Sequence, residues 1–590
     1  MNTSLVSAAA LARRDRLYRR TWARVTMVVV GSALFNGAAA IAIRRPRIFG
    51  DELIYWQLSR GLAWAGAFTM RGKAAPHYGV LYPALLAAAQ RLGGDETTAY
   101  ALAKLSNVVV FALAAVPVYL LASRIVAARH ALLVSALAVV LPSCVYTSTV
   151  MTENAFYPLF LTSALLMLRA LERPTILRQL LVTVSTAAAF LVRAQAVVLL
   201  PSYLLAALVL ALATSRSRAT SALAACLRRQ APTVIVLALG AAAATVVSGR
   251  STLGPYHVLV TSYGPRPLAH WALANLADFE LYLGVVPVAA FLVLLVRALS
   301  PGAPMSPELR RFVVLTACLG VGILATVAAL SASPYGLGRV HERNLFYVAP
   351  LVLICFFAWL EAGMPRPPDA RAAVAVALVL LPLAIPAAAV GMSGEDGIAL
   401  LLWDDLGLRP TVAIDGMVVT AAILVVVFLR ARRPAIPLGV CLVALAAGLA
   451  VGETHAVQSL DSNRDQWRDF DWIDRTVGRD ARVVALWATR ENRYRGIEGL
   501  WADEFFNRSV RDVASENGPL PDGLPVEELR IRANGCLAAT FPWRPQYAVV
   551  EAGRPLAATV VRVSPSRRAV LYRLAGRPDA PGCFARLRRR

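Results

Sequence analysis

The segment VTMVVVGSALFNGAAAIAI, residues 25–43, contains no charged side chain, and it sets the fold class of this chain. An apolar helix of about 20 residues crosses the hydrocarbon core of a bilayer, which is about 30 Å thick. Similar runs recur up to residue 452. Across the 590 residues, 58% are hydrophobic and 16% are charged, against about 45–50% and about 25% in a typical soluble domain. These features predict an all-α polytopic membrane protein.

The apolar runs predict thirteen transmembrane helices. They lie near 25–43, 105–123, 131–149, 155–171, 179–193, 196–213, 233–248, 281–298, 312–331, 345–361, 372–391, 411–429 and 436–452. An N-terminus on the inner side and an odd number of spans place everything after Gly452 on the outer face.

The basic residues support this orientation. The net charge is +24, which would suit nucleic acid, but the arginines gather in short clusters in every second loop. That pattern is the positive-inside rule. The clusters lie at 13–24, 124–129, 173–178, 216–229, 310–311 and 430–433. We therefore expect a multi-pass plasma-membrane protein that does not bind nucleic acid and whose active face is extracytoplasmic.

The predicted domains follow from this topology. Residues 1–24 form a basic cytoplasmic N-terminus, 25–452 form the transmembrane domain with a first outer loop at 44–104, and 453–590 form an extracytoplasmic domain. In the first loop, 52–64 and 80–92 are typical of interfacial or re-entrant helices. In the tail, 481–488, 547–552, 557–563 and 568–574 indicate strands and 465–477 a helix, so an α+β or β-rich domain is expected. It would suit a carbohydrate-binding sandwich or a structural cap.

Cysteines add one constraint on this domain. Five of the seven lie in apolar runs, and Cys536 and Cys583 lie in the tail. An extracytoplasmic location permits a disulfide between the last two, and two free thiols are the alternative.

Two adjacent carboxylates follow the first span, at Asp51 and Glu52. Acids close to apolar surface are costly, and their mutual repulsion would favour a general base acting near neutral pH. A solvated acidic cap at a helix N-terminus is the alternative. Glu153 lies in a polar interruption between two apolar runs, where it would line a cavity, bind a metal ion, orient the Asp51–Glu52 pair, or simply begin a helix.

Basic side chains complement these acids. Arg193 interrupts two apolar runs, and Arg339, His341 and Arg343 precede another. Guanidinium groups at this depth suit a lipid phosphate, although arginines at helix ends also snorkel to the interface. The outer-loop residues Tyr256 and His257 suit sugar or isoprenoid contact, or else an ordinary interfacial belt.

An acidic group at Glu395, Asp396, Asp404 and Asp405 is expected to be solvated. No metal-ligand spacing is present.

Several of these motifs together resemble the GT-C superfamily of lipid-linked sugar transferases, over roughly residues 25–360. The run Gly50-Asp51-Glu52-x-x-Tyr55-x-x-x-Ser59-Arg60 is similar to the first outer-loop motif of its protein O-mannosyltransferase and aminoarabinose transferase group. Tyr82-Pro83, Thr152-Glu153-Asn154, Leu191-Val192-Arg193-Ala194-Gln195 and Arg343-Asn344-Leu345-Phe346-Tyr347 also resemble recurrent pieces. The outer domain is similar in placement to those of actinobacterial arabinosyltransferases, and an Arg-rich, Lys-poor chain fits an actinobacterial source.

The resemblance implies an inverting transfer of a sugar, arabinofuranose or mannose, from a polyprenyl-phosphate donor to a glycan, lipid or protein acceptor. Asp51 would be the base, with Glu52 and Glu153 shaping its site. Arg343 would bind the donor phosphate with Arg339, His341 and Arg193. Tyr55, His77, Tyr82, Tyr256 and His257 would bind substrate. No cofactor is implied, and a divalent metal is compatible but not required.

Two departures weaken individual assignments. Relatives often have Arg-Pro where this chain has Arg193-Ala194, and a Tyr where it has Asn344. Two other functions compete with the transferase. An envelope-precursor transporter or flippase would also use many spans and intramembrane arginines, but no internal repeat of the kind such proteins carry is present. A noncatalytic sugar-binding membrane protein is the other alternative.

Overall fold

The computed structural model describes residues 2–43, 46, 49–75, 78–214, 219–248, 264–300, 302–366, 368–392, 394–461, 469–488, 497–520, 524–539, 541, 543–564, 566, 568–574 and 584–586. The chain forms two compact units. Unit 1 comprises residues 1–37, 108–146 and 152–454, and unit 2 comprises residues 38–107, 147–151 and 455–590. Helices α1 (Asn2–Ala42), α4 (Glu96–Ala112) and α21 (Ala435–Asp461) contribute to both.

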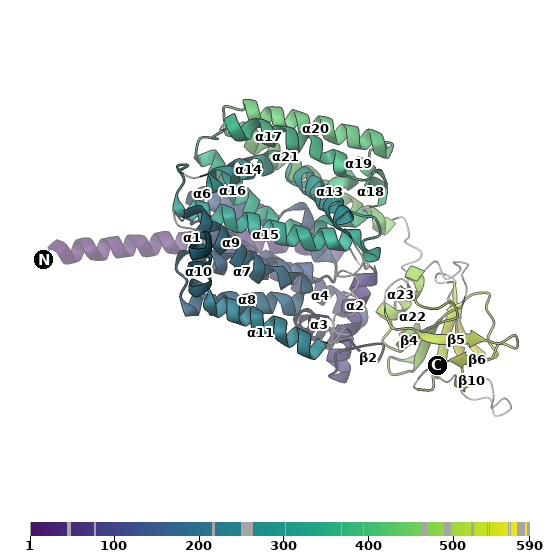
Figure 1. Ribbon diagram of the computed structural model, residues 1–590. Coiled ribbons are helices and arrows are strands. Elements are labelled where there is room, and N and C mark those ends of the chain that lie inside the picture. Colours follow the sequence, from purple (N-terminus) through teal and green to yellow (C-terminus); the bar gives the residue numbers. More distant parts are fainter. Residues whose placement is uncertain are drawn as a thin grey trace. The chain divides into compact units, whose positions relative to one another are not determined.

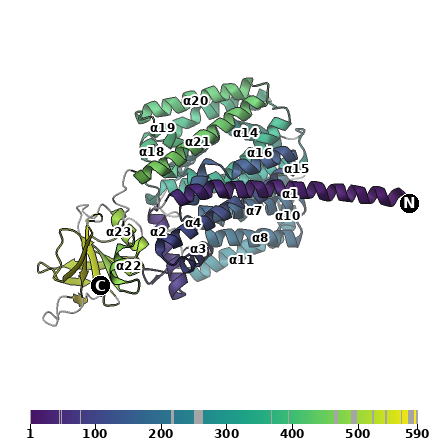
Figure 2. The same cartoon turned by 180° about the vertical axis from the view of Figure 1, so that it is seen from behind.

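Unit 1 is a bundle of apolar helices (Figure 1). Its α-helices are α5 (Ala115–Ala122), α6 (Ala128–Ala138), α7 (Glu153–Glu172), α8 (Ile176–Val192), α9 (Leu199–Thr214), α10 (Ala219–Arg229), α11 (Ala231–Ser248), α13 (Pro265–Leu283), α14 (Val286–Leu299), α15 (Pro307–Ala332), α16 (Ala349–Glu361), α17 (Pro368–Leu380), α18 (Ala387–Met392), α19 (Ile398–Asp404), α20 (Pro410–Arg430) and α21 (Ala435–Asp461). Helix α15 packs against α9, α13 and α14. Helix α20 packs on α14 and α17 and lies at the edge of the bundle in both views (Figures 1 and 2).

Local sequence explains where these helices begin. Helix α15 has Pro307 in its first turn, where a missing N–H costs nothing. The Ser306 hydroxyl accepts a hydrogen bond from the backbone N–H of Leu309 at 3.2 Å, so one of the orphan donors at the helix start is satisfied. Thr175 caps α8 in the same way, by accepting from the N–H of Arg178.

The helices confirm a multi-pass membrane protein. Among the described residues, seven helices are long and apolar enough to cross a bilayer, and the number rises to ten if each of three bent pairs is one span. All thirteen predicted spans overlap a described helix, but several overlap bent pairs or apolar helices of 10–17 residues. The described helices therefore confirm the class of protein, and the count of thirteen stays a prediction.

The sharpest bend among the three bent pairs is 115°, between α13 and α14. Gly284 and Val285 both have positive φ, 78° and 63°, a region that right-handed helix cannot include. At Gly284 a Cβ atom would lie 2.6 Å from the Cβ of Ala444. Glycine is therefore required there both for backbone conformation and for the close approach of α21.

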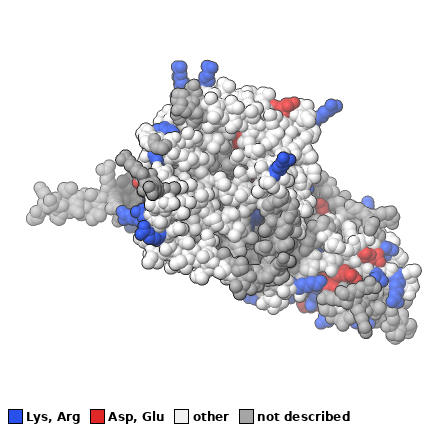
Figure 3. Space-filling view, viewed as in Figure 1, with Lys and Arg blue, Asp and Glu red and all other residues white. Residues whose placement is uncertain are grey.

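Charge is sparse on the bundle surface. On the face shown in Figure 3, the described surface of the bundle is mostly uncharged and most of its few Lys and Arg side chains lie toward its margins. Large apolar side chains such as Leu239, Val321 and Val443 are more than 60% exposed. Exposed apolar surface with charge confined to helix ends is expected when lipid is the solvent.

Unit 2 contains a mixed sheet and the first loop. The loop carries α2 (Phe49–Arg60), a π-helix (Gly61–Ala65), the hairpin β1 (Thr69–Met70) and β2 (Lys73–Ala74), and α3 (Leu81–Leu92). The tail carries α22 (Trp472–Val477), α23 (Ile497–Phe506), β3 (Val483–Trp487), β4 (Val510–Ser515), β5 (Glu527–Ile531), β6 (Leu537–Ala539), β7 (Tyr547–Glu551), β8 (Thr559–Ser564), β9 (Ala569–Arg573) and β10 (Phe584–Arg586). The predicted helices of the first loop and the predicted strands of the tail are thus present. Residues 465–468 of the predicted helix lie outside the described residues.

The eight tail strands form one sheet in the order β10-β6-β5-β4-β3-β7-β9-β8. The central strand β3 pairs in parallel with β4 and β7, whereas β7, β9 and β8 pair antiparallel. Side chains of β3 alternate between two cores: Val483 packs with Trp472 and Leu500, and Leu486 packs with Phe541 on the other face. The described strands therefore do not form the sandwich considered from the sequence.

The cysteines divide as the sequence suggested. Cys144, Cys226, Cys318, Cys355 and Cys441 are buried and form no disulfide. Cys536 is disulfide-bonded, and Cys583 lies outside the described residues.

Within unit 2, the first loop and the tail share a core. The Trp56 ring of α2 stacks on Phe505 of α23, with centroids 4.9 Å apart and planes 4° from parallel. The Trp56 indole N–H donates to the Phe505 carbonyl at 3.0 Å. Arg60 donates to the carbonyls of Glu504 and Phe505 at 3.1 and 2.8 Å. These contacts hold α2 against α23.

A buried ion pair also joins the first loop to α23. The Arg71 guanidinium donates from Nε and Nη2 to the two carboxylate oxygens of Glu504, both at 2.6 Å, and neither side chain is exposed. Arg71 also donates to the Pro525 carbonyl at 2.8 Å, and Gln57 donates to Glu504 at 2.9 Å. With the carboxylate fully bonded, the charge of Arg71 is compensated away from water.

We expect Glu504→Gln to destabilise unit 2 by about 3–5 kcal/mol, because it leaves the Arg71 charge buried without its partner. The double variant Arg71→Met with Glu504→Leu removes both charges and should recover most of that loss. The measurement is the denaturant midpoint of proteolytic protection in the purified full chain, with the exposed Arg530→Gln as the matched control. An unchanged midpoint in Glu504→Gln would contradict this account.

Candidate functional site

Glu153 and Arg193 form the polar centre of unit 1. Glu153 is the first residue of α7 and is 1% exposed, so its carboxylate is removed from water. Arg193 follows α8 in extended conformation and precedes the 3-10 helix η3 (Ala194–Val198). Its Nη1 lies 3.0 Å from Oε2 of Glu153. The two residues, predicted separately from the sequence, are brought together.

Arg193 also ties three segments to each other. It donates to the Thr152 hydroxyl at 2.5 Å, to Oδ1 of Asn344 at 2.6 Å and to Oε1 of Gln195 at 3.2 Å. Gln195 in turn donates to the Asn344 carbonyl at 2.9 Å. Each guanidinium nitrogen of Arg193 therefore has a protein partner, and the start of α7, the end of α8 and residues 342–344 are held together.

Arg343 is the second arginine of this centre. Its Nε lies 4.0 Å from Oε1 of Glu153 and 2.7 Å from Oδ1 of Asp396. Arg339 and His341 also approach Asp396, at 3.5 and 3.9 Å. The predicted basic group Arg339, His341 and Arg343 thus converges on one carboxylate.

The expectation that Asp396 is solvated was wrong. Asp396 is 8% exposed, because the 3-10 turn η10 (Gly394–Asp396) and α19 turn its carboxylate toward Arg343 and His341. The backbone N–H of Ala399 at the start of α19 donates to Oε2 of Glu342 at 2.8 Å, which fixes this arrangement. Asp404 and Asp405 are exposed as expected, and the side chain of Glu395 lies outside the described residues.

The charges of this cluster do not balance. Three guanidinium groups, Arg193, Arg339 and Arg343, face two carboxylates, Glu153 and Asp396, which leaves a net charge of +1. Burial lowers the pKa of His341 below its ordinary value, and Asp396 offsets this only in part. The imidazole is therefore neutral near pH 7, and the excess positive charge belongs to the arginines.

Two further acids lie behind this cluster and were not singled out from the sequence. Asp278 of α13 is fully buried and neither carboxylate oxygen has a hydrogen-bond partner in the described structure. Burial, followed by the negative charge of Asp278, raises the pKa of Glu342 well above its ordinary value. Burial and the neighbouring acid therefore both favour the protonated form of Glu342. In the sequence, Asp278 could have been noticed only as an acidic residue within residues 265–283.

In unit 2, Asp51 and Glu52 share the first turn of α2 but not an environment. Glu52 is fully buried and accepts hydrogen bonds from the Tyr100 hydroxyl at 3.0 Å and from the backbone N–H of Val150 at 2.8 Å. Asp51 is half-buried. Glu52 therefore anchors the segment 147–151, and Asp51 is the accessible member of the pair.

The predicted substrate-binding residues also differ in how deeply they are buried. Tyr55 is half-buried and packs edge-on against Tyr82 and Tyr78, with centroids 5.6 and 6.4 Å apart. Tyr82 is fully buried and donates to Oδ1 of Asn107 at 3.2 Å. His77, Tyr256 and His257 lie outside the described residues. Among the residues that the structure does describe, no group of three or more His, Cys, Asp or Glu is arranged to hold a metal ion.

Comparison with known protein families places this centre in context. Residues 76–237 match the family model described as dolichyl-phosphate-mannose-protein mannosyltransferase. The matched segment includes Glu153 and Arg193. No curated protein sequence matches the chain.

Several solved structures are similar to this chain, and one of them reaches a TM-score of 0.50. ArnT from Cupriavidus metallidurans bound to undecaprenyl phosphate matches with a TM-score of 0.50 and 12% identity, over 93% of this chain and 97% of that one. Arabinosyltransferase EmbB from Mycobacterium smegmatis matches with a TM-score of 0.41 and 14% identity, over 75% of this chain and 41% of that one. The oligosaccharyltransferase of Archaeoglobus fulgidus in the apo form gives 0.39 and 12%, over 78% and 62%.

Residues 76–237, which include Glu153 and Arg193, are therefore similar to a family of protein mannosyltransferases, and the chain shares its fold with ArnT.

Proposed function

We propose that this protein is an inverting glycosyltransferase that moves a sugar from a polyprenyl-phosphate donor to an acceptor hydroxyl outside the cytoplasm. The observation that carries the proposal is the net-positive cluster of Arg339, Arg343 and Arg193 around Glu153 and Asp396. Guanidinium groups in a largely desolvated site bind phosphate strongly. The fold is shared with ArnT, whose structure holds undecaprenyl phosphate.

Arg343 and Arg339 are the proposed phosphate ligands. Their side chains are 11% and 35% exposed, so Arg339 is the more accessible and Arg343 the more desolvated. Asp396 lies between them and offsets part of their charge. Arg193 and Glu153 hold Arg343 in place, while neutral His341 contributes a ring nitrogen for hydrogen bonding.

Asp51 is the proposed general base. Its carboxylate takes the proton of the acceptor hydroxyl as the acceptor oxygen attacks the anomeric carbon. The bond from that carbon to the phosphate oxygen breaks, and the electron pair leaves with the polyprenyl phosphate. Arg343 and Arg339 stabilise the charge that develops on the departing phosphate. One displacement inverts the anomeric configuration, and no covalent sugar–enzyme intermediate forms.

The proposal extends to the identity of the donor sugar and of the acceptor. The matched family model is described for mannose on dolichyl phosphate, and the sequence also resembles arabinosyltransferases. Polyprenyl-phosphate mannose and polyprenyl-phosphate arabinofuranose are therefore the two donors to test, with glycan, lipid and protein acceptors of the cell envelope.

Asp51→Asn should reduce transfer of radiolabelled sugar from polyprenyl phosphate by about 10²–10⁴-fold, the usual contribution of a general base. Expression and donor binding should stay normal, because Glu52 and not Asp51 anchors the segment 147–151. Asp404→Asn, at an exposed acid, is the control. Full activity of Asp51→Asn would discard Asp51 as the base.

Arg343→Gln should lower the transfer rate by about 10²–10³-fold, since it removes a donor to the charge formed in the transition state. Arg339→Gln, at a more exposed arginine, should have a smaller effect on rate. The test is kcat and KM for the donor in nanodiscs, with the exposed Arg409→Gln as control. Equal activity of Arg343→Gln and the control would remove Arg343 from the mechanism.

The proposed orientation places the tail outside the cytoplasm. Asn517 is exposed in the turn after β4, and the five thiol cysteines of the described chain are all buried. A cysteine introduced by Asn517→Cys should therefore react with a membrane-impermeant maleimide in intact cells. Labelling that requires lysis would reverse the topology.

A further inference from the structure

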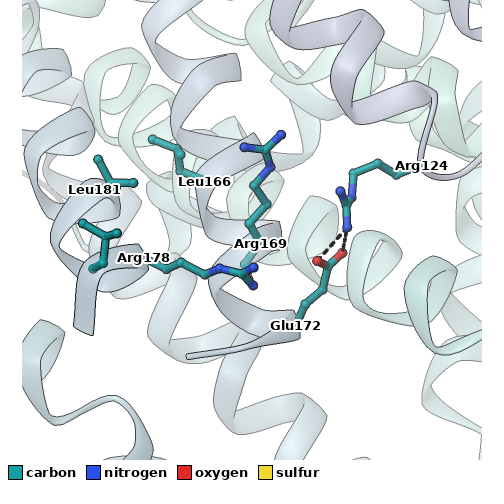
Figure 4. Close-up of a pocket in the computed structure, with 7 residues that line it drawn as sticks. Arg124, Leu166, Arg169, Glu172, Arg178 and Leu181 are labelled. Carbon is teal, nitrogen blue, oxygen red and sulfur yellow. Dashed lines mark hydrogen bonds and ion pairs between the residues drawn. The ribbon is translucent and has the colours of Figure 1, made fainter. Parts of the chain in front are cut away.

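A second basic site lies at the other end of α7 from Glu153. A cavity of about 360 Å³ is lined by Arg124, Arg169, Arg178 and Glu172 and by three leucines. Figure 4 shows Arg124 paired with Glu172, with Leu166 close to Arg169. Helix α7 runs for 20 residues from Glu153 to Glu172, which is about 30 Å at 1.5 Å per residue. That distance equals the thickness of the hydrocarbon core, so this cavity and the Glu153 cluster belong to opposite interfaces.

The arginines of the cavity differ in their hydrogen-bond and ion-pair partners. Arg124 donates from Nη2 to both carboxylate oxygens of Glu172 at 2.6 Å, which neutralises that pair. Arg178 donates to the backbone carbonyl of Arg169 at 2.7 Å and has no carboxylate partner in the described structure. The guanidinium of Arg169 has neither a hydrogen bond nor an ion pair within the described part of the chain. Three arginines and one glutamate leave a net charge of +2.

Apolar surface continues from the cavity along α8. Leu166, Leu177 and Leu181 line it, and Ile176, Leu177, Leu180 and Leu181 are between 42% and 74% exposed. Their spacing of i, i+1, i+4 and i+5 places them on one face of the helix. The site thus offers guanidinium groups beside an open apolar stripe.

We propose that this cavity binds the phosphodiester headgroup of an anionic glycerophospholipid, with the acyl chains lying along α8. Guanidinium groups match phosphate oxygens in charge and geometry, and basic pockets between membrane helices suit such headgroups. A free phosphate would use the arginines but not the leucine stripe. The site is separate from the proposed donor site, so its failure would leave the proposed glycosyl transfer unaffected.

The experiment is native mass spectrometry of the full chain released from nanodiscs of equimolar phosphatidylcholine and phosphatidylglycerol. Wild-type protein should retain phosphatidylglycerol over phosphatidylcholine. Arg169→Gln should reduce that retention about fivefold, as expected for the loss of one arginine at a membrane surface. Arg178→Gln provides a second variant in case Arg169→Gln fails to fold, and the exposed Arg432→Gln is the control.

Three results would overturn the proposal. They are equal retention in Arg169→Gln, Arg178→Gln and Arg432→Gln, displacement of the lipid by inorganic phosphate alone, and selective displacement by undecaprenyl phosphate. The second would indicate a phosphate site without a lipid, and the third a site for the carrier lipid. Loss in the two cavity variants with retention in the control supports a phospholipid site.

Discussion

A carboxylate taken out of water needs a cation beside it, and the polar centre of unit 1 is organised around this requirement. Glu153 is almost completely buried and pairs with Arg193 at 3.0 Å. Removing one partner of such a pair leaves an uncompensated charge at a cost of about 3–5 kcal/mol. Arg193 must therefore stay in place, and its bonds to Thr152 and Asn344 fix the neighbouring segments. Arg343, the residue before Asn344, is positioned by the same network.

The sequence predicts those features of the fold that depend on residues close together in the chain. Apolar runs located the membrane helices because hydrocarbon excludes charge along the whole length of a span. Short runs of strand-forming residues such as Val and Tyr, bounded by turn signals, located β3, β7, β8 and β9. Which strands become neighbours depends on contacts between distant segments, so the parallel pairing of β3 with both β4 and β7 was not predictable. The bends at Gly284 and elsewhere were missed because they depend on packing between helices.

The candidate site shows the same division between local and distant information. Asp51, Glu153, Arg193 and Arg343 were selected as charged residues next to apolar runs, and the structure joins three of them in one network. Asp396 was misjudged because its neighbours in sequence, Glu395 and Gly397, resemble an exposed acidic loop. Its burial depends on Arg343, 53 positions earlier in the chain. Glu504 similarly gave no signal, since its partner Arg71 lies in the first loop.

The tail has a structural consequence for the residue proposed as the base. Asp51 lies on α2, and α2 is held within unit 2 by Trp56 stacked on Phe505 and by Arg60 bonded to the end of α23. The hairpin that follows α2 is fixed by Arg71 to the Glu504 carboxylate. The tail therefore completes the core on which the first loop folds. A loop of this length without secondary-structure partners would lose considerable backbone entropy on ordering, and the shared core with the tail offsets that cost. Asp51 thus lies on a helix that is held by contacts with residues 444 to 449 positions later in the chain.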